Sequence, residues 1–372
     1  MRRWWRLGAA TAVLLILFSS GTHAFALAGP NPAVLKSVFI AKELTGLTWD
    51  GSEFIATNGT TNVPLVKVSL DGKTVAPFAP SFVGKDEVYI AISQGQAGFP
   101  AGYLYVNSDP SIYQISPNGS SVRLFSSPPG ASRIAYVAFD TVGTWGNLLF
   151  AVDDNGLLWS IKSDGTAAVL DNFTTDFGKG LKPEGIAVAP QSFGAYGGDL
   201  IVTLEGVGRV LAIPPGDPSV WTTIATLPGQ APERVLTIPP QSDLYLAGFD
   251  TGNMSMVPAA NFTSYADAML VVTEGETEKL GTFNVLQASG GQVSLTEIGA
   301  VDFRPHFEGA AWVPANELST ASATASGSEV GQISIGTLVG GLGLLGVAVV
   351  LAFYFAFWRR RRLSGNAVVG QR

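Results

Sequence analysis

The feature that most constrains this sequence is a repeat of short apolar segments, each of which ends in a turn. The segments start roughly 45 to 50 residues apart, apart from a last gap of about 75. The six of them are Leu44–Gly51, Glu87–Ile92, Arg133–Phe139, Pro183–Pro190, Pro232–Pro239 and Phe307–Pro314. A unit this thin cannot bury a hydrophobic face alone, so the units must stack into one continuous core.

Further strand-like runs follow these segments. Asn147–Val152, Asp199–Leu204 and Asp243–Gly248 predict second strands in their units, and Leu157–Ile161 predicts a third. Hairpin signals such as Asn118-Gly119 precede the fourth strand. Four short strands per unit predict an all-β fold, a six-bladed β-propeller whose inner strands line a central channel.

The last blade has the least regular sequence. We expect its strands to come from Lys279–Gln287 and Gln292–Ile298, with Val34–Ile40 closing the ring from the N-terminus. A β-sandwich is the alternative architecture, and the even repeat spacing favours the propeller over it. The 44 glycines, 22 prolines and 14% charged residues suit many turns and disfavour a helical bundle.

The two ends of the chain are predicted to direct it to a membrane. Residues 1–28 have the pattern of a secretory signal peptide: arginines, then the apolar run Leu7–Phe18, then small residues that permit cleavage after Ala24, Ala26 or Ala28. An uncleaved anchor is the alternative. The propeller is then expected to occupy residues 29–318.

A polar stalk rich in Ser, Thr and Ala (319–332) precedes a predicted single transmembrane helix (333–358) and a short basic cytoplasmic tail (359–372). The aromatic residues and arginines that end the span place the propeller outside the cell and the C-terminus inside. Gly336 and Gly340 form a GxxxG pair within the span, which allows a weak homodimer.

Charge and cysteine content exclude several classes of protein. Eight arginines lie at the two ends, and the residues between them carry 29 acidic groups against 14 basic ones. Such an acidic surface repels phosphate backbones, so nucleic-acid binding is not expected. With no cysteine there is no disulfide framework, no thiolate metal site and no cysteine nucleophile.

The blade repeat resembles a known group of propellers. The runs Pro183–Val188, Gly197–Val202 and Gly208–Ile213, with Phe307–Trp312 repeating the first, are similar to the blade motif of NHL, SMP-30 (gluconolactonase-like) and TolB-like six-bladed propellers. The resemblance implies a divalent ion at the channel mouth, held by a glutamate whose counterpart here is Glu184 or Glu308. It also implies lactonase chemistry as one candidate activity.

The residues that align at the start of the six inner strands are predicted to form a ring at one channel mouth. They are Thr45, Glu87, Arg133, Glu184, Glu233 and Glu308. Four carboxylates that converge repel one another unless a cation compensates them, and oxygen ligands of this kind suit Ca²⁺. Alternatively, these glutamates cap strand ends and pair with Arg133, Arg234 or water.

Two other features of the sequence are candidate sites. The run Asp153–Gly156 fits a calcium loop loosely and a hairpin turn better. His306 is the one histidine that remains after signal cleavage, and it lies beside the last segment. It is therefore the candidate catalytic base, or else a hydrogen-bonded structural residue.

Five N-x-S/T sequons mark sites for glycosylation if the host glycosylates exported proteins: Asn58, Asn118, Asn172, Asn253 and Asn261.

Taken together, these features of the sequence predict a membrane-anchored cell-surface propeller that acts as a non-catalytic binding, adhesion or scaffold module for an extracellular ligand or protein. The alternative functions are a divalent-metal-dependent lactonase or esterase-type hydrolase and a structural envelope protein that packs with its own copies.

Overall fold

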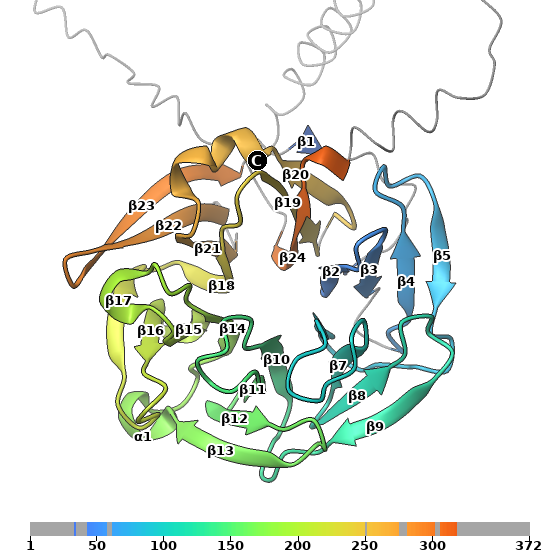
Figure 1. The fold of residues 1–372 in the computed structure, drawn as a ribbon, viewed down its shortest axis with the longest axis horizontal. Helices are drawn as coiled ribbons and strands as arrows, with labels where there is room; N and C mark the ends of the chain where they lie inside the picture. The colour runs from blue at the N-terminus through green and yellow to red at the C-terminus, as the bar shows by residue number, and fades with distance from the viewer. Residues whose placement is uncertain are drawn as a thin grey trace, which may run out of the picture. The chain divides into compact units, whose positions relative to one another are not determined.

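The six predicted segments form the inner strands of six sheets arranged as a ring (Figure 1). The computed structural model describes residues 33–34, 43–57, 62–249, 251–274, 281–301 and 306–317. Within those ranges there are six four-stranded antiparallel sheets, and neighbouring inner strands contact one another around the ring. The all-β six-bladed propeller predicted from the repeat is confirmed.

Four blades take their strands in simple chain order, from the inner strand outwards. They are β2 (Leu47–Trp49), β3 (Phe54–Thr57), β4 (Leu65–Val68) and β5 (Val75–Phe78); β6 (Ile90–Ile92), β7 (Leu104–Ser108), β8 (Ser111–Ile115) and β9 (Val122–Ser126); β10 (Ile134–Phe139), β11 (Leu149–Asp153), β12 (Leu157–Ile161) and β13 (Ala167–Asn172); and β14 (Pro183–Val188), β15 (Leu200–Leu204), β16 (Arg209–Ile213) and β17 (Thr222–Thr226).

The last two blades exchange strands. The fifth blade is β18 (Ala231–Thr237), β21 (Met269–Glu274), β22 (Gly281–Ser289) and β23 (Gln292–Val301), and the sixth is β24 (Phe307–Pro314), β19 (Ser242–Gly248), β20 (Met254–Val257) and β1 (Ala33–Val34). Short helices lie in the connections: α1 (Thr174–Phe177), η1 (Gly194–Tyr196), η2 (Glu205–Val207), η3 (Ala259–Asn261) and η4 (Thr263–Tyr265).

This exchange corrects two predictions. Asp243–Gly248 does not follow its own inner strand but pairs with β24, and the runs around β22 and β23 belong to the fifth blade rather than the last. Pro239 and Pro240 follow Ile238, whose N–H still donates to the Ala268 carbonyl oxygen beside β21. The chain then continues to the next blade instead of turning back as a hairpin.

The N-terminal segment completes the sixth blade as predicted, although the strand is Ala33–Val34, which pairs with Ser255 and Met256 of β20. Residues 35–42 lie outside the described ranges. The predicted signal peptide, stalk, membrane span and tail also lie outside them. In the part of the chain that is described, no helix is long and apolar enough to cross a membrane.

The hydrophobic core consists of six clusters, each between two neighbouring blades. Strand β11 shows why the sequence reads as continuous apolar runs. Leu149 and Ala151 pack towards the second blade, while Phe150 and Val152 pack towards the fourth. Both faces of the strand are buried, so the alternation of a half-exposed strand is absent. One cluster joins the first and sixth blades and closes the ring.

Candidate functional site

The predicted ring residues converge at one end of the channel. A cavity of about 240 Å³, called the channel mouth below, is lined by Glu87, Arg133, Lys182, Glu184, Glu205, Glu233, Phe249, Glu274, His306 and Glu308. Five of the six predicted ring residues are among them. The sixth, Thr45, is buried beneath this surface, where its hydroxyl contacts Thr57 Oγ1 at 2.7 Å and donates to the Val88 carbonyl oxygen at 3.2 Å.

Three of the glutamates stand on β-bulges at the same position of their inner strands. In β14 the register skips Glu184, in β18 it skips Glu233, and in β24 it skips Glu308. A bulge leaves one residue without a cross-strand partner and re-aims its side chain. The same device repeated in three blades therefore brings these three carboxylates to one cavity.

Glycine after the bulged glutamate lets the next inner strand approach closely. A Cβ on Gly185 would lie 2.9 Å from the Glu233 carbonyl oxygen, and one on Gly309 would lie 2.3 Å from that of Thr45. Real Cβ atoms do not come so near to backbone oxygens. The Glu-Gly pairs in the sequence motif thus serve two purposes: the glutamate reaches the cavity, and the glycine admits the neighbouring blade.

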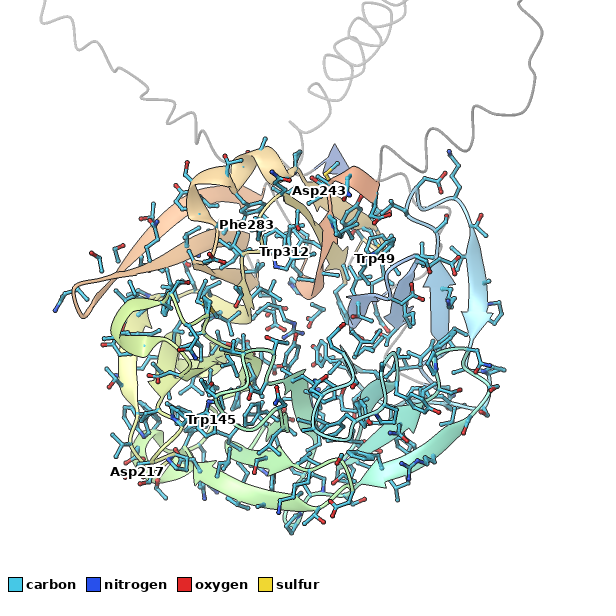
Figure 2. All side chains as sticks on the ribbon, viewed as in Figure 1. Trp49, Trp145, Asp217, Asp243, Phe283 and Trp312 are labelled. Carbon is cyan, nitrogen blue, oxygen red and sulfur yellow. The ribbon has the colours of Figure 1, made fainter. Side chains whose placement is uncertain are left out.

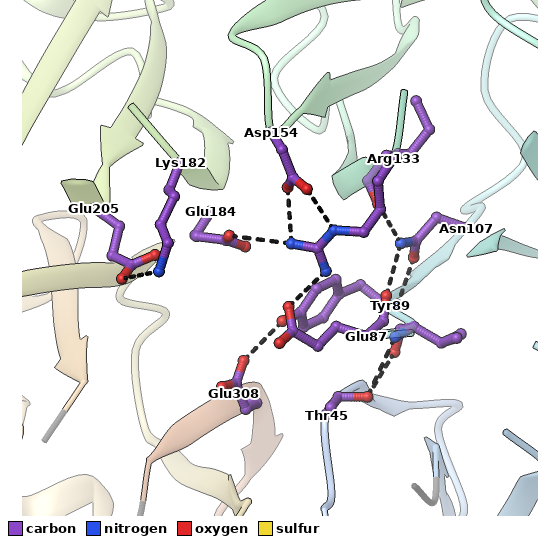
Figure 3. A network of polar contacts seen from close by, with 12 residues as sticks. Thr45, Glu87, Tyr89, Asn107, Arg133, Asp154, Lys182, Glu184, Glu205 and Glu308 are labelled. Atoms are coloured by element: carbon purple, nitrogen blue, oxygen red, sulfur yellow. Dashed lines mark hydrogen bonds and ion pairs between the residues drawn. The ribbon is translucent and has the colours of Figure 1, made fainter. Parts of the chain in front are cut away.

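Arg133 occupies a different structural position from the bulged glutamates. The bulge residue of β10 is Ala135. Arg133 therefore lies two residues before the position that the bulged glutamates occupy in their strands. Its guanidinium lies between blades (Figure 3). Nη1 donates to Glu87 Oε2 at 2.8 Å, and Nε and Nη2 donate to the two carboxylate oxygens of Asp154 at 2.6 and 2.8 Å.

The run Asp153–Gly156 is a hairpin turn between β11 and β12. Asp153 is buried, and its carboxylate accepts the backbone N–H groups of Leu157 and Ser132. The Gly156 N–H donates to the Asp153 carbonyl oxygen at 2.9 Å. These bonds occupy the carboxylate in the turn, so the hairpin interpretation is the one that the structure supports.

A second arginine fills the channel below the mouth. The side chain of Arg234 is 1% exposed. Its guanidinium carbon lies 4.0 Å from the ring centroid of Tyr89 and 4.6 Å from that of Tyr136. Nη1 lies 2.7 Å from Glu233 Oε1 and donates to the carbonyl oxygens of Glu184 and Glu233. The centre of the ring, open between the ribbons, is occupied by side chains (Figure 2).

Tyr89 links this arginine to the ring of glutamates. Its hydroxyl donates to Glu308 Oε2 at 2.7 Å, while Arg234 Nη2 lies 3.6 Å from the same oxygen. Asn107 fixes Tyr89 from behind, because its Oδ1 accepts the Tyr89 N–H at 2.5 Å and its Nδ2 donates to the Ile134 carbonyl oxygen at 2.6 Å. The second and third blades are thereby joined directly at the channel.

Burial dominates the electrostatics of the cluster. Removal from water raises the pKa of Glu184 and Glu233 well above the ordinary value, and it also raises the pKa of Glu308. Arg234 acts in the opposite direction on all three pKa values, since its positive charge favours the ionised carboxylates. Neighbouring carboxylates also raise the pKa of Glu184 and Glu233, as expected from their convergence, whereas a hydrogen bond with Glu233 lowers that of Glu308.

The carboxylates of the channel mouth lie beside guanidinium groups. Among the residues described, no three carboxylate or imidazole groups are arranged so that they could hold one ion. Calcium needs six to eight oxygen atoms at about 2.3–2.6 Å. Here guanidinium groups lie between the carboxylates instead, which supports the alternative that these glutamates pair with Arg133 and Arg234. Calcium binding at the ring stays a prediction from sequence.

His306 lies on the wall of the channel mouth, as predicted. Its Nδ1 lies 3.4 Å from Glu274 Oε1, and its ring stacks on Phe249 with centroids 6.3 Å apart. The Phe249 N–H donates to the His306 carbonyl oxygen at 2.7 Å. A carboxylate and an aromatic ring are thus among the neighbours of His306, and its role as a catalytic base stays a prediction.

Several residues of the channel mouth were not singled out from the sequence. Lys182 precedes β14, while Glu205 and Glu274 lie at the ends of second strands. In an antiparallel pair the second strand ends beside the start of the first. Applied to the aligned repeats, this rule places the carboxylates of Glu205 and Glu274 at the channel mouth, where the inner strands begin.

Two further hollows lie near the channel. A groove of about 410 Å³ shares Lys182, Glu205 and Glu274 with the channel mouth and continues along Gly206–Gly208 and Gly229–Ala231. A cavity of about 300 Å³ is lined by the later residues of the inner strands, among them Ile90, Phe139, Val235 and Trp312. It therefore has an apolar lining, in contrast to the acidic channel mouth.

The sequons lie outside this site. Asn118 is exposed in the turn between β8 and β9, Asn172 ends β13, Asn253 precedes β20, and Asn261 lies in η3. Asn58 falls outside the described residues. Their glycosylation stays a prediction.

No protein-family model and no curated protein matches the sequence. Solved structures do match. A chain of the nidogen–laminin complex is 16% identical over 74% of this chain and 86% of that one, with a TM-score of 0.50. The likeness is one of fold.

Two other matches lie in the group that the sequence resembles. Regucalcin from Agrobacterium tumefaciens, described as a calcium-binding protein, is 12% identical over 77% of this chain and 83% of that one, with a TM-score of 0.49. A gluconolactonase from Xanthomonas campestris is 12% identical over 74% and 86%, with a TM-score of 0.45. The six-bladed propeller that the resemblance implied is the fold that the six sheets form.

Proposed function

We propose that this chain is a non-catalytic binding module, displayed outside the cell on a membrane anchor. One observation supports it above the others: arginines pair with carboxylates that the sequence predicts as metal ligands. Arg133 pairs with Glu87 and Asp154, and Arg234 pairs with Glu233. The chain itself therefore supplies part of the cationic charge that the glutamates need.

The plug formed by Arg234 also favours binding over chemistry. Its guanidinium packs against the rings of both Tyr89 and Tyr136 and fills the channel next to the carboxylates. A substrate would therefore be confined to the channel mouth. A rigid face with recessed polar groups suits recognition of a partner. The extracellular location rests on the predicted signal peptide and span.

A metal-dependent lactonase or esterase is the second candidate, because the channel mouth holds Glu184 and Glu308 near His306. The test uses the full chain reconstituted in lipid vesicles and a panel of lactones and simple esters, with millimolar Ca²⁺ or Mg²⁺. We expect no hydrolysis above that of empty vesicles. Cation-stimulated hydrolysis that a Glu184→Gln variant abolishes would overturn the binding proposal and establish the hydrolase.

A further inference from the structure

The channel mouth carries more negative than positive groups. Six glutamates line it, and Asp154 faces Arg133 at its edge. The cations on or just below this surface are Arg133, Lys182 and Arg234, with His306 adding a charge only when it is protonated. The cluster therefore has a surplus of negative charge even when every recorded ion pair is formed.

The recorded ion pairs place each cation closer to other carboxylates than to that of Glu184. Arg133 is held by Glu87 and Asp154, and Lys182 Nζ lies 3.1 Å from Glu205 Oε1. Among the described residues, the ion pair recorded for the Glu184 carboxylate is a distant one, 3.8 Å from its Oε1 to Arg133 Nη2.

The second carboxylate oxygen of Glu184 is the clearest sign of a missing partner. Its side chain is 5% exposed, and Oε2 is buried with no hydrogen-bond donor among the described residues. Leaving such an oxygen buried and unbonded is unfavourable, so a ligand that brings both a positive charge and N–H donors would be stabilised there.

We propose that the channel mouth binds the ammonium or guanidinium group of a basic ligand, with Glu184 as its principal acceptor; this deepens the binding function proposed above. The cavity of about 240 Å³ is smaller than pockets for drug-sized ligands, which start near 300 Å³, and suits one group the size of a side chain. Phe249 supplies an aromatic wall, a surface that attracts organic cations and packs against their alkyl stems.

The neighbouring groove points to a protein segment as the source of that group. It opens from the same Lys182, Glu205 and Glu274 that line the channel mouth, and glycine backbone forms much of its remaining wall. A peptide lying in the groove would place one lysine or arginine side chain in the cavity. The acidic charge of the folded region favours approach of such a basic segment.

The experiment uses the full chain in detergent micelles and titration calorimetry. The probes are acetyl-Gly-Gly-Lys-Gly-Gly-amide, the same peptide with norleucine in place of lysine, butylamine, and Ca²⁺ alone. We expect the lysine peptide to bind at least tenfold more tightly than the norleucine peptide. Glu184→Gln should reduce its affinity at least tenfold, while Glu297→Gln, the same change on exposed β23, should leave it unaltered.

The wild-type protein supplies a readout that needs no variant. Burial, together with Glu87, Glu205 and Glu308, raises the pKa of Glu184 against the opposing effect of Arg234. Binding of a cation should therefore release protons, which calorimetry detects as a heat that depends on the ionisation enthalpy of the buffer. Proton release with the lysine peptide and none with the norleucine peptide supports the site.

The outcomes separate this inference from the function on which it rests. Equal binding of the lysine and norleucine peptides, or no binding of either, overturns the basic-ligand site and leaves the binding function standing. Butylamine that binds as tightly as the lysine peptide supports the ammonium site and assigns it to free amines. Displacement of the lysine peptide by Ca²⁺ beyond the effect of sodium at matched ionic strength overturns the inference in favour of a metal site.

Discussion

The guanidinium carbon of Arg234 in the fifth blade lies 4.0 Å from the ring centroid of Tyr89 in the second blade, inside the channel of the propeller. The tyrosine hydroxyl continues the contact by donating to Glu308 of the sixth blade. Three blades thus meet through one buried cation. The arginine contacts an aromatic ring and is also ion-paired with Glu233 and Glu308. It therefore both fills the channel and compensates carboxylates of the channel mouth.

The first prediction concerns this arginine. Arg234→Met should lower the free energy of unfolding by about 3–5 kcal/mol, because it leaves buried carboxylates without their cation. Adding Glu233→Gln should restore part of the loss, since it removes one of the uncompensated charges. Urea denaturation measures both. Arg123→Met, on an exposed strand position, is the matched control and should change stability by less than about 0.5 kcal/mol. An equally small effect at Arg234 would contradict the assigned role.

The second prediction concerns pH. An unfolded glutamate titrates near its ordinary value of 4.5, whereas burial raises the pKa of Glu184 and Glu233 in the folded protein. Between those values the folded state binds more protons, so the free energy of unfolding should fall as pH rises from about 5 to about 8.

The Glu184→Gln variant tests that assignment. It replaces a buried carboxylate by a neutral amide, so the melting temperature should rise at about pH 8 and its decline with pH should be shallower than in the wild type. Glu297→Gln should follow the wild-type curve. Identical curves for all three proteins would show that Glu184 does not carry the pH dependence.

The third prediction concerns the glycine after the bulge. Gly185→Ala should destabilise the fold by about 1–3 kcal/mol, because its Cβ would lie 2.7 Å from Thr203 Oγ1 and 2.9 Å from the Glu233 carbonyl oxygen. Gly216→Ala has no atom within 4 Å of the added Cβ and should change stability by less than about 0.5 kcal/mol. Thermal unfolding of both variants checks this, and an unperturbed Gly185→Ala protein would refute the close approach.

The fourth prediction tests the topology read from the sequence. Protease added to intact cells should release a soluble fragment of nearly full propeller size by cutting within Ser319–Ser328, a polar low-complexity run of the kind that proteases cut first. Mass spectrometry of the released fragment locates the cut. A C-terminus that is cleaved from outside the cell would reverse the proposed orientation.

Strand exchange between the fifth and sixth blades was beyond the sequence pattern. The repeat spacing located all six inner strands, because each is a short apolar run with both faces buried. Which second strand joins which inner strand depends on the connections, because β19 and β21 are both almost fully buried strands.

The carboxylate ring was predicted from the start of the inner strands, and Glu87, Glu184, Glu233 and Glu308 do line one cavity. Their compensation was left open between a metal ion and arginine. That choice depends on where Arg234 points, and residues in a strand next to a bulge do not follow the simple alternation that sequence reasoning assumes. The stacking on Tyr89 needs residues from blades that are far apart in the chain.

The sequence by itself determined the class of fold, the number of blades and the mouth where carboxylates gather, because strand periodicity and repeat spacing are local properties of the chain. The tertiary structure alone decided the blade membership of β19 and β20, the plug at Arg234 and the unbonded oxygen of Glu184. Each of these depends on contacts between blades, and such contacts form only when the ring closes and removes the channel residues from water.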